Sequence, residues 1–119
     1  MSDGISSFED AVAFALTLPD TVLSTSYGKP AVKVASNGRA FLYTGHEQAT
    51  SFGVGIDLDT VEILKETDPD TFWQSPHYEG WPAVLIRFDS ADPERVRDVI
   101  SRSRDWTAAM KPPRARKRK

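Results

Sequence analysis

The pair Asn37-Gly38 constrains this chain most, because it separates two apolar-rich stretches, residues 31–36 and 39–44. Asn-Gly is the preferred centre of a two-residue type I′ turn, which joins adjacent antiparallel strands. A turn of that length fixes the register and pairs Val34 with Phe41 and Val32 with Tyr43. The sequence therefore predicts an antiparallel hairpin whose core face carries these four apolar side chains.

The rest of the chain also divides into short helical and strand patterns. A capping box at Ser6 and Glu9 predicts a helix that ends at Leu18-Pro19, and Asp92-Pro93 predicts the start of a last helix. Between them we expect a strand over residues 22–27, which ends at the breaking segment 28–30, and a strand over 51–57. We also expect a short helix that begins near residue 59 and an apolar central strand over 81–89.

Helices are too few in this order for a doubly wound parallel sheet. The pattern predicts a single two-layer α+β domain over residues 1–110, with an antiparallel sheet and helices packed mainly on one face. No cysteine is present, which excludes a disulfide framework and thiolate metal sites. No apolar run reaches the roughly 20 residues of a membrane span, and the first residues lack a secretory pattern. We therefore expect a cytoplasmic protein without a membrane partner.

The strand expected over residues 51–57 carries Gly53 and Gly55 on one face. Two glycines at this spacing suit a twisted strand. They also permit another element or a ligand to approach the backbone closely. Both interpretations remain open from the sequence.

Charge is divided unevenly along the chain. Of the 15 basic side chains, six lie in residues 111–119, where there is no acid; the other nine share residues 1–110 with all 17 acids, a net charge of −8. We expect residues 111–119 to form a disordered basic tail after the main domain. Such a tail can neutralise phosphates with release of counterions, or it can simply be solvated.

A catalytic or metal constellation is not evident in the sequence. His46 and His77 do not lie at a metal-ligand spacing, and no phosphate-binding loop or serine-nucleophile motif occurs. Asp57 and Asp59 could bind magnesium, but helix capping explains them better. We expect no catalytic residue, no metal and no cofactor, and we favour a non-enzymatic role without excluding an enzyme.

Aromatic side chains are concentrated in residues 72–81, which hold Phe72, Trp73, Tyr78 and Trp81 beside His77. Such a segment can form a stacking platform for bases, the wall of a ligand pocket, or a loop that covers an open sheet. If it forms a pocket, we expect the lining to include Tyr27, His77, Tyr78 and Trp81.

Four segments together resemble the MmcQ/YjbR family of small bacterial proteins. They are Leu18-Pro19 with the run TSYGKPA over residues 25–31, the hairpin over residues 32–41, the stretch DPDTFWQSPHYEGWP over 68–82, and the last helix with its basic end over 92–114. The resemblance implies a small α+β domain. It also implies DNA binding, through a likeness to a double-wing arrangement of hairpins.

Two functional hypotheses follow. In the first, the protein binds DNA without sequence preference through phosphate contacts from its basic side chains: Lys29, Lys33, Arg39, Arg97, Arg104, Lys111, Arg114, Arg116, Lys117, Arg118 and Lys119. In the second, it is a small-ligand or protein-binding module that uses the aromatic segment. Clustering of the cations on one face favours DNA, whereas convergence of the aromatic set on one cavity favours a ligand.

Overall fold

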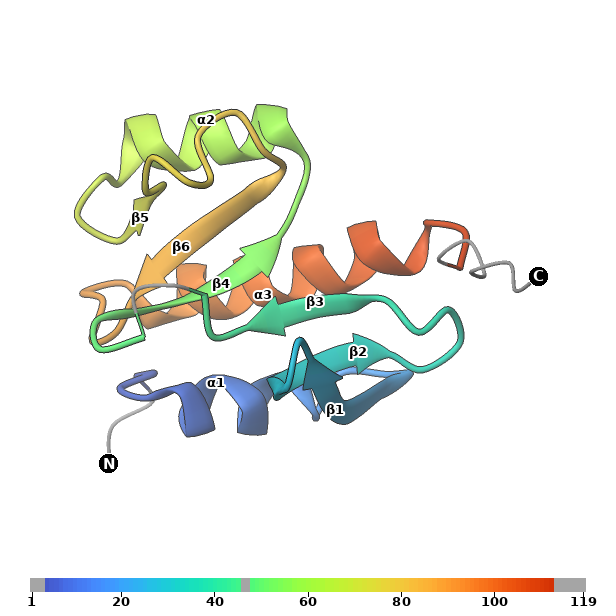
Figure 1. The fold of residues 1–119 in the computed structure, drawn as a ribbon. Coiled ribbons are helices and arrows are strands. Elements are labelled where there is room, and N and C mark those ends of the chain that lie inside the picture. The colour runs from blue at the N-terminus through green and yellow to red at the C-terminus, as the bar shows by residue number, and fades with distance from the viewer. Residues whose placement is uncertain (1–3, 46–47, 113–119) are drawn as a thin grey trace.

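The computed structural model describes residues 4–45 and 48–112, which form three helices and a six-stranded sheet (Figure 1). In chain order the elements are α1 (Phe8–Ala15), β1 (Thr21–Ser26), β2 (Lys29–Val34), β3 (Ala40–Tyr43), β4 (Ser51–Gly55), α2 (Leu58–Thr67), β5 (Phe72–Trp73), β6 (Ala83–Arg87) and α3 (Pro93–Ala108). The strand order is β1-β2-β3-β4-β6-β5, and every neighbouring pair is antiparallel. The predicted α+β class and antiparallel sheet are confirmed.

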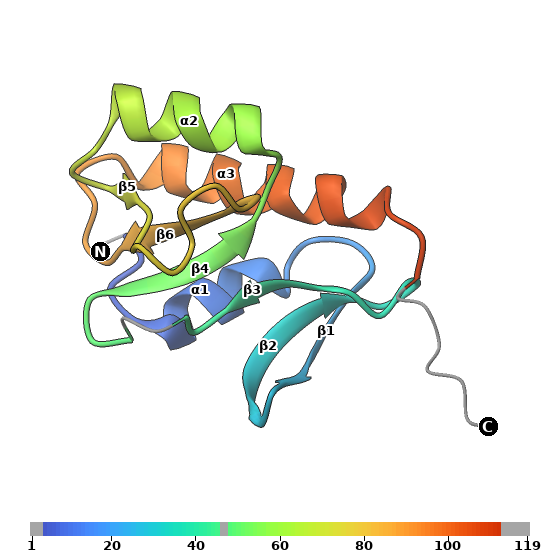
Figure 2. The same cartoon turned by 45° about the horizontal axis from the view of Figure 1, so that its top comes forward.

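The helices share one core with one face of the sheet. Apolar side chains of α1, α2 and α3 belong to the same buried cluster as Phe41, Phe52 and Phe72 from three different strands. Figures 1 and 2 show α3 running along the sheet next to β3 and β4, which it contacts. Strand β6 lies inside the sheet, and the side chains of residues 83–86 are buried on both faces, as its apolar sequence predicts.

Each helix begins at a side-chain cap. Ser7 caps α1 by accepting a hydrogen bond from the Asp10 amide (3.1 Å), and the Asp10 carboxylate accepts from the Ser6 amide (3.0 Å). The predicted capping box at Ser6 and Glu9 is therefore one residue early: Ser7 is the N-cap, and Asp10 reaches back to the amide of Ser6, the residue before it. The carboxylates of Asp57 and Asp92 cap α2 and α3 by accepting hydrogen bonds from the amides of Thr60 and Arg95.

The two-residue hairpin turn lies at Tyr27-Gly28, not at Asn37-Gly38. Ser26 pairs with Lys29 across it, and the two turn residues have φ values of 54° and 81°. Positive φ at both central positions is what a type I′ turn requires. Residues 28–30 therefore do not break the sheet as predicted, since β2 starts directly after the turn at Lys29.

The loop at Asn37 is longer than predicted because its side chain serves the end of α3. The Val34 amide donates to the Arg39 carbonyl, which leaves four residues, 35–38, in the loop. The Asn37 amide nitrogen donates to the carbonyls of Thr107 (2.8 Å) and Met110 (3.0 Å). The preference of Asn-Gly for a tight turn is thus overridden by a tertiary cap on the last turn of α3.

A bulge in β3 also changes the predicted register. Val32 pairs with Leu42 and Lys33 with Ala40, so Phe41 is an extra residue in β3. Phe41 and Leu42 consequently both enter the core, and Tyr43 turns to the opposite face beside Ala31. The predicted pairs of Val34 with Phe41 and of Val32 with Tyr43 are wrong, although the burial of Val32, Val34 and Phe41 is confirmed.

Candidate ligand-binding site

The face of the sheet opposite the helices is only partly covered. On it lie the two glycines of β4 and, on β6, the fully buried Leu85. The segment after β5, residues 74–82, crosses this face, and the Trp73 ring lies 4.6 Å from the guanidinium carbon of Arg87. This covering creates a second, smaller packed region around Leu85, separate from the main core.

Gln74 organises the segment over residues 74–82. Its side-chain nitrogen donates to the carbonyls of Tyr78 (2.9 Å), Trp81 (3.0 Å) and Ala83 (2.8 Å), and its oxygen accepts from Lys65 Nζ (2.8 Å). One side chain thereby fixes both ends of the segment to the start of β6 and to α2. The aromatic side chains of the segment are held in place by these contacts to the backbone.

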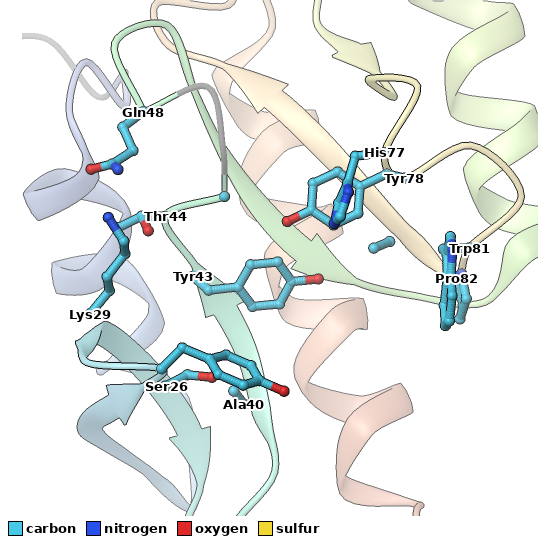
Figure 3. A pocket seen from close by; sticks show the side chains of 13 residues that line it. Ser26, Lys29, Ala40, Tyr43, Thr44, Gln48, His77, Tyr78, Trp81 and Pro82 are labelled. Carbon is cyan, nitrogen blue, oxygen red and sulfur yellow. The ribbon is translucent and has the colours of Figure 1, made fainter.

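A cavity of about 800 Å³ opens between this segment and the β1–β2 hairpin. It contains all four residues that the sequence proposes for a pocket: Tyr27, His77, Tyr78 and Trp81. Figure 3 shows Tyr43 and Tyr78 inside the cavity, with His77 and Trp81 on one side and Lys29 on the other. Tyr27 is fully exposed and Trp81 is 63% exposed, so the rim presents aromatic surface to solvent.

The inner tyrosines are neutral phenols at physiological pH. Burial raises the pKa of Tyr43 far above its usual value, and the neighbouring Tyr78 raises it further. Burial also raises the pKa of Tyr78. The His77 ring meets Tyr78 edge-on, with centroids 5.3 Å apart. A protonated phenol both donates and accepts hydrogen bonds, so the interior suits a polar ligand of moderate size.

A smaller hollow of about 350 Å³ adjoins the cavity and shares with it Ser26, Ala40, Tyr43 and Pro82. It exists because β3 and β4 separate after pairing at only two positions, Leu42 with Val54 and Tyr43 with Gly53. Ser103 of α3 bridges the separated strands, since its hydroxyl lies 3.2 Å from the Phe41 carbonyl and 2.5 Å from the Gly55 carbonyl. Trp106 completes the wall of the hollow.

The two hollows are lined by cations and not by acids. Lys29 lines the larger cavity, and Lys33 and Arg39 line the smaller hollow. Among the residues that the structure describes, no Asp or Glu lines either one. This composition contrasts with residues 1–110 as a whole, where acids outnumber bases by eight.

The described basic residues that the sequence proposes for DNA binding lie on several different elements. Arg97 and Arg104 stand on α3 and line neither hollow; Arg104 is held by the Pro19 carbonyl (3.1 Å) and by Asp105 (2.5 Å). Arg39 donates through Nε to the Lys111 carbonyl (2.5 Å). The remaining predicted contacts lie outside the described residues: Arg114, Arg116, Lys117, Arg118 and Lys119.

The aspartates and histidine that the sequence raises as metal candidates either have other structural surroundings or lie outside the described residues. Asp57 caps α2 through the Thr60 amide, and Asp59 is exposed. No group of side chains suited to a metal ion occurs within residues 4–45 and 48–112, and His46 lies outside them. In the same part of the chain, no helix is long and apolar enough to cross a membrane.

Among the residues that the sequence does not indicate are Tyr43, which lines the cavity, and Gln74, which holds the segment over residues 74–82 in place. Tyr43 was assigned to the core, and only its pairing opposite Gly53 could have indicated an aromatic side chain lying over a bare backbone. Gln74 carries no signal beyond its place within the aromatic segment.

Comparison with known proteins identifies the family. No curated protein and no solved structure gives a significant match to the chain. The YjbR family model matches residues 16–106, from the end of α1 to the last turns of α3. This match spans well over half of the sequence. It includes β2, β3 and residues 74–82, which form walls of the two hollows. The chain therefore belongs to the YjbR family.

Proposed function

We propose that this protein is a binding module that takes a small molecule in the larger cavity. The observation that carries the proposal is the convergence of Tyr27, His77, Tyr78 and Trp81, from segments some fifty residues apart, on one cavity of about 800 Å³. Its volume falls in the range of small-molecule sites. Exposed aromatic rings at its rim and neutral phenols inside provide apolar contact together with a few directed hydrogen bonds.

A thermal-shift screen of a compound library tests this function. A ligand at 100 times its Kd adds about 2.7 kcal/mol to the stability of the native state, which raises the Tm of a domain this size by roughly 10 °C. The same compound should shift Ile63→Ala, whose exposed side chain on α2 lies outside the cavity. It should shift Trp81→Ala and Tyr78→Phe much less. A library without any stabilising compound would reject the proposal.

A second candidate function is duplex DNA binding without sequence preference through residues 111–119. Six cations and no acid in nine residues support it. If six phosphates are neutralised, the logarithm of the DNA-binding constant should fall with the logarithm of the salt concentration with a slope of roughly −5. Replacing the six cations with glutamine should abolish binding, because the rest of the chain carries a net charge of −8. Salt-titrated fluorescence anisotropy measures both effects, and the absence of binding at about 50 mM salt rejects this candidate.

A further inference from the structure

We infer that the ligand of this site is a nucleoside phosphate, with its base among the aromatic side chains of the larger cavity and its phosphate beside Lys33 and Arg39. The inference rests on the proposed function, and it adds the chemical class of the ligand and the direction in which the ligand lies.

Electrostatics argues for an anionic ligand. Three of the nine cations in residues 1–110 line the two adjoining hollows, whereas none of the 17 acids in that range is found among the described lining residues. Cations gathered in a concave surface with low-dielectric walls focus their field inside it. A site that collects positive charge within an acidic protein therefore selects for negative charge in its occupant.

The aromatic side chains argue for a planar group at the other end of the ligand. Tyr27 and Trp81 leave most of their surface in solvent although large aromatic side chains are normally buried. They belong to different segments, the β1–β2 turn and residues 74–82, and they line the same cavity. Aromatic rings placed in this way offer stacking surfaces to a nucleobase.

The shape of the site joins these two ends. Ser26 and Tyr43 line both hollows, so the passage from the aromatic cavity to the cationic hollow lies beside two hydroxyl groups. A sugar at this junction would find hydrogen-bond partners in both. A base, a sugar and a phosphate in sequence match an aromatic cavity, a hydroxyl-lined junction and a cationic hollow.

Isothermal titration calorimetry with the full chain separates the contributions of base and phosphate. We expect 5′-AMP to bind about tenfold or more tightly than adenosine, which lacks the phosphate, ribose 5-phosphate, which lacks the base, or inorganic phosphate, which lacks both base and sugar. Equal affinities of AMP and adenosine would overturn the inference. So would a failure of AMP and UMP to bind while a library compound still stabilises the protein, a result that leaves the proposed function intact.

Variants then locate each part of the ligand. Lys33→Gln should lower the affinity for AMP about tenfold and leave adenosine unchanged, whereas Trp81→Ala should weaken both. Lys29→Gln gives a second, independent test of the charge, and Arg102→Gln is the control, since its exposed side chain on α3 pairs only with Asp98 in the described contacts. An unchanged AMP affinity in both lysine variants, with an unchanged Tm, would overturn the inference.

A phosphorylated oligonucleotide distinguishes the source of the ligand. If a 5′-phosphorylated thymidine tetranucleotide binds no more tightly than thymidine 5′-monophosphate, the site takes a free nucleotide. If it binds much more tightly, and Lys33→Gln still reduces its affinity, the site takes the end of a single strand. Both results support the same nucleoside-phosphate chemistry, and binding that is insensitive to Lys33→Gln and Trp81→Ala contradicts it.

Discussion

The ring of Tyr43 lies directly on the backbone of Gly53, its cross-strand partner. A Cβ atom placed on Gly53 would stand 2.6 Å from Cε1 and 2.9 Å from Cδ1 of the tyrosine. The same ring is part of the cavity wall. The absence of a side chain at position 53 thus determines where a wall of the site stands.

Gly53→Ala should therefore destabilise the protein and displace Tyr43. Overpacking of this kind costs about 1–3 kcal/mol in the free energy of unfolding. Gly55→Ala is the matched control on the same strand and face, because the nearest atom to its Cβ would lie 3.6 Å away, an ordinary contact. Urea unfolding measures both. In a double-mutant cycle with Tyr43→Ala, the cost of Gly53→Ala should largely disappear, and additive costs would contradict the contact.

Phe41→Ala should cost about 3–5 kcal/mol, because the bulge directs this fully buried ring into the main core. Leu23→Ala on β1 is the comparison, since its side chain is 52% exposed and its loss should change stability much less. Chemical denaturation reports both values. Similar costs for the two substitutions would show that Phe41 is not a core residue.

Asn37→Ala should loosen the end of α3. It removes the donors to the Thr107 and Met110 carbonyls, and the Thr107 carbonyl then keeps one partner among the described residues, the Met110 amide. The loss of the two hydrogen bonds should cost about 1–3 kcal/mol in the free energy of unfolding. Amide hydrogen exchange should become faster in the last turn of α3 and remain slow at its first turn. Ser36→Ala, an exposed change in the same loop, should leave both the exchange pattern and the Tm unaltered.

Stability should fall as the pH rises above about 10, the usual pKa of tyrosine in an unfolded chain. Burial raises the pKa of Tyr43 in the folded protein, so above that pH the unfolded chain releases a proton that the native state retains. The stabilisation is fully present below pH 10. It decreases by up to about 1.4 kcal/mol per pH unit above it. Urea unfolding at several alkaline pH values should give a shallower decline for Tyr43→Phe than for Tyr27→Phe.

Local patterns in the sequence determined much of the fold and the identity of several site residues. The antiparallel α+β class, the last helix after Asp92-Pro93 and the central strand β6 follow from capping chemistry and apolar periodicity, which depend on neighbouring residues alone. The density of aromatic residues around Tyr78 likewise indicated the segment that forms one wall of the cavity.

Tertiary contacts decided what those patterns could not. The Asn37 side chain reaches the Thr107 carbonyl seventy residues away in the sequence, and the loop that holds it has four residues where the sequence predicts a two-residue turn. The bulge at Phe41 turned Tyr43 from the core to the cavity, and a period of two residues cannot reveal such a shift. Lys33 and Arg39 line the smaller hollow beside the aromatic cavity, and the position of that hollow depends on where β3 and β4 separate over Ser103. That separation is a property of packing between α3 and the sheet, and no single segment of the sequence contains it.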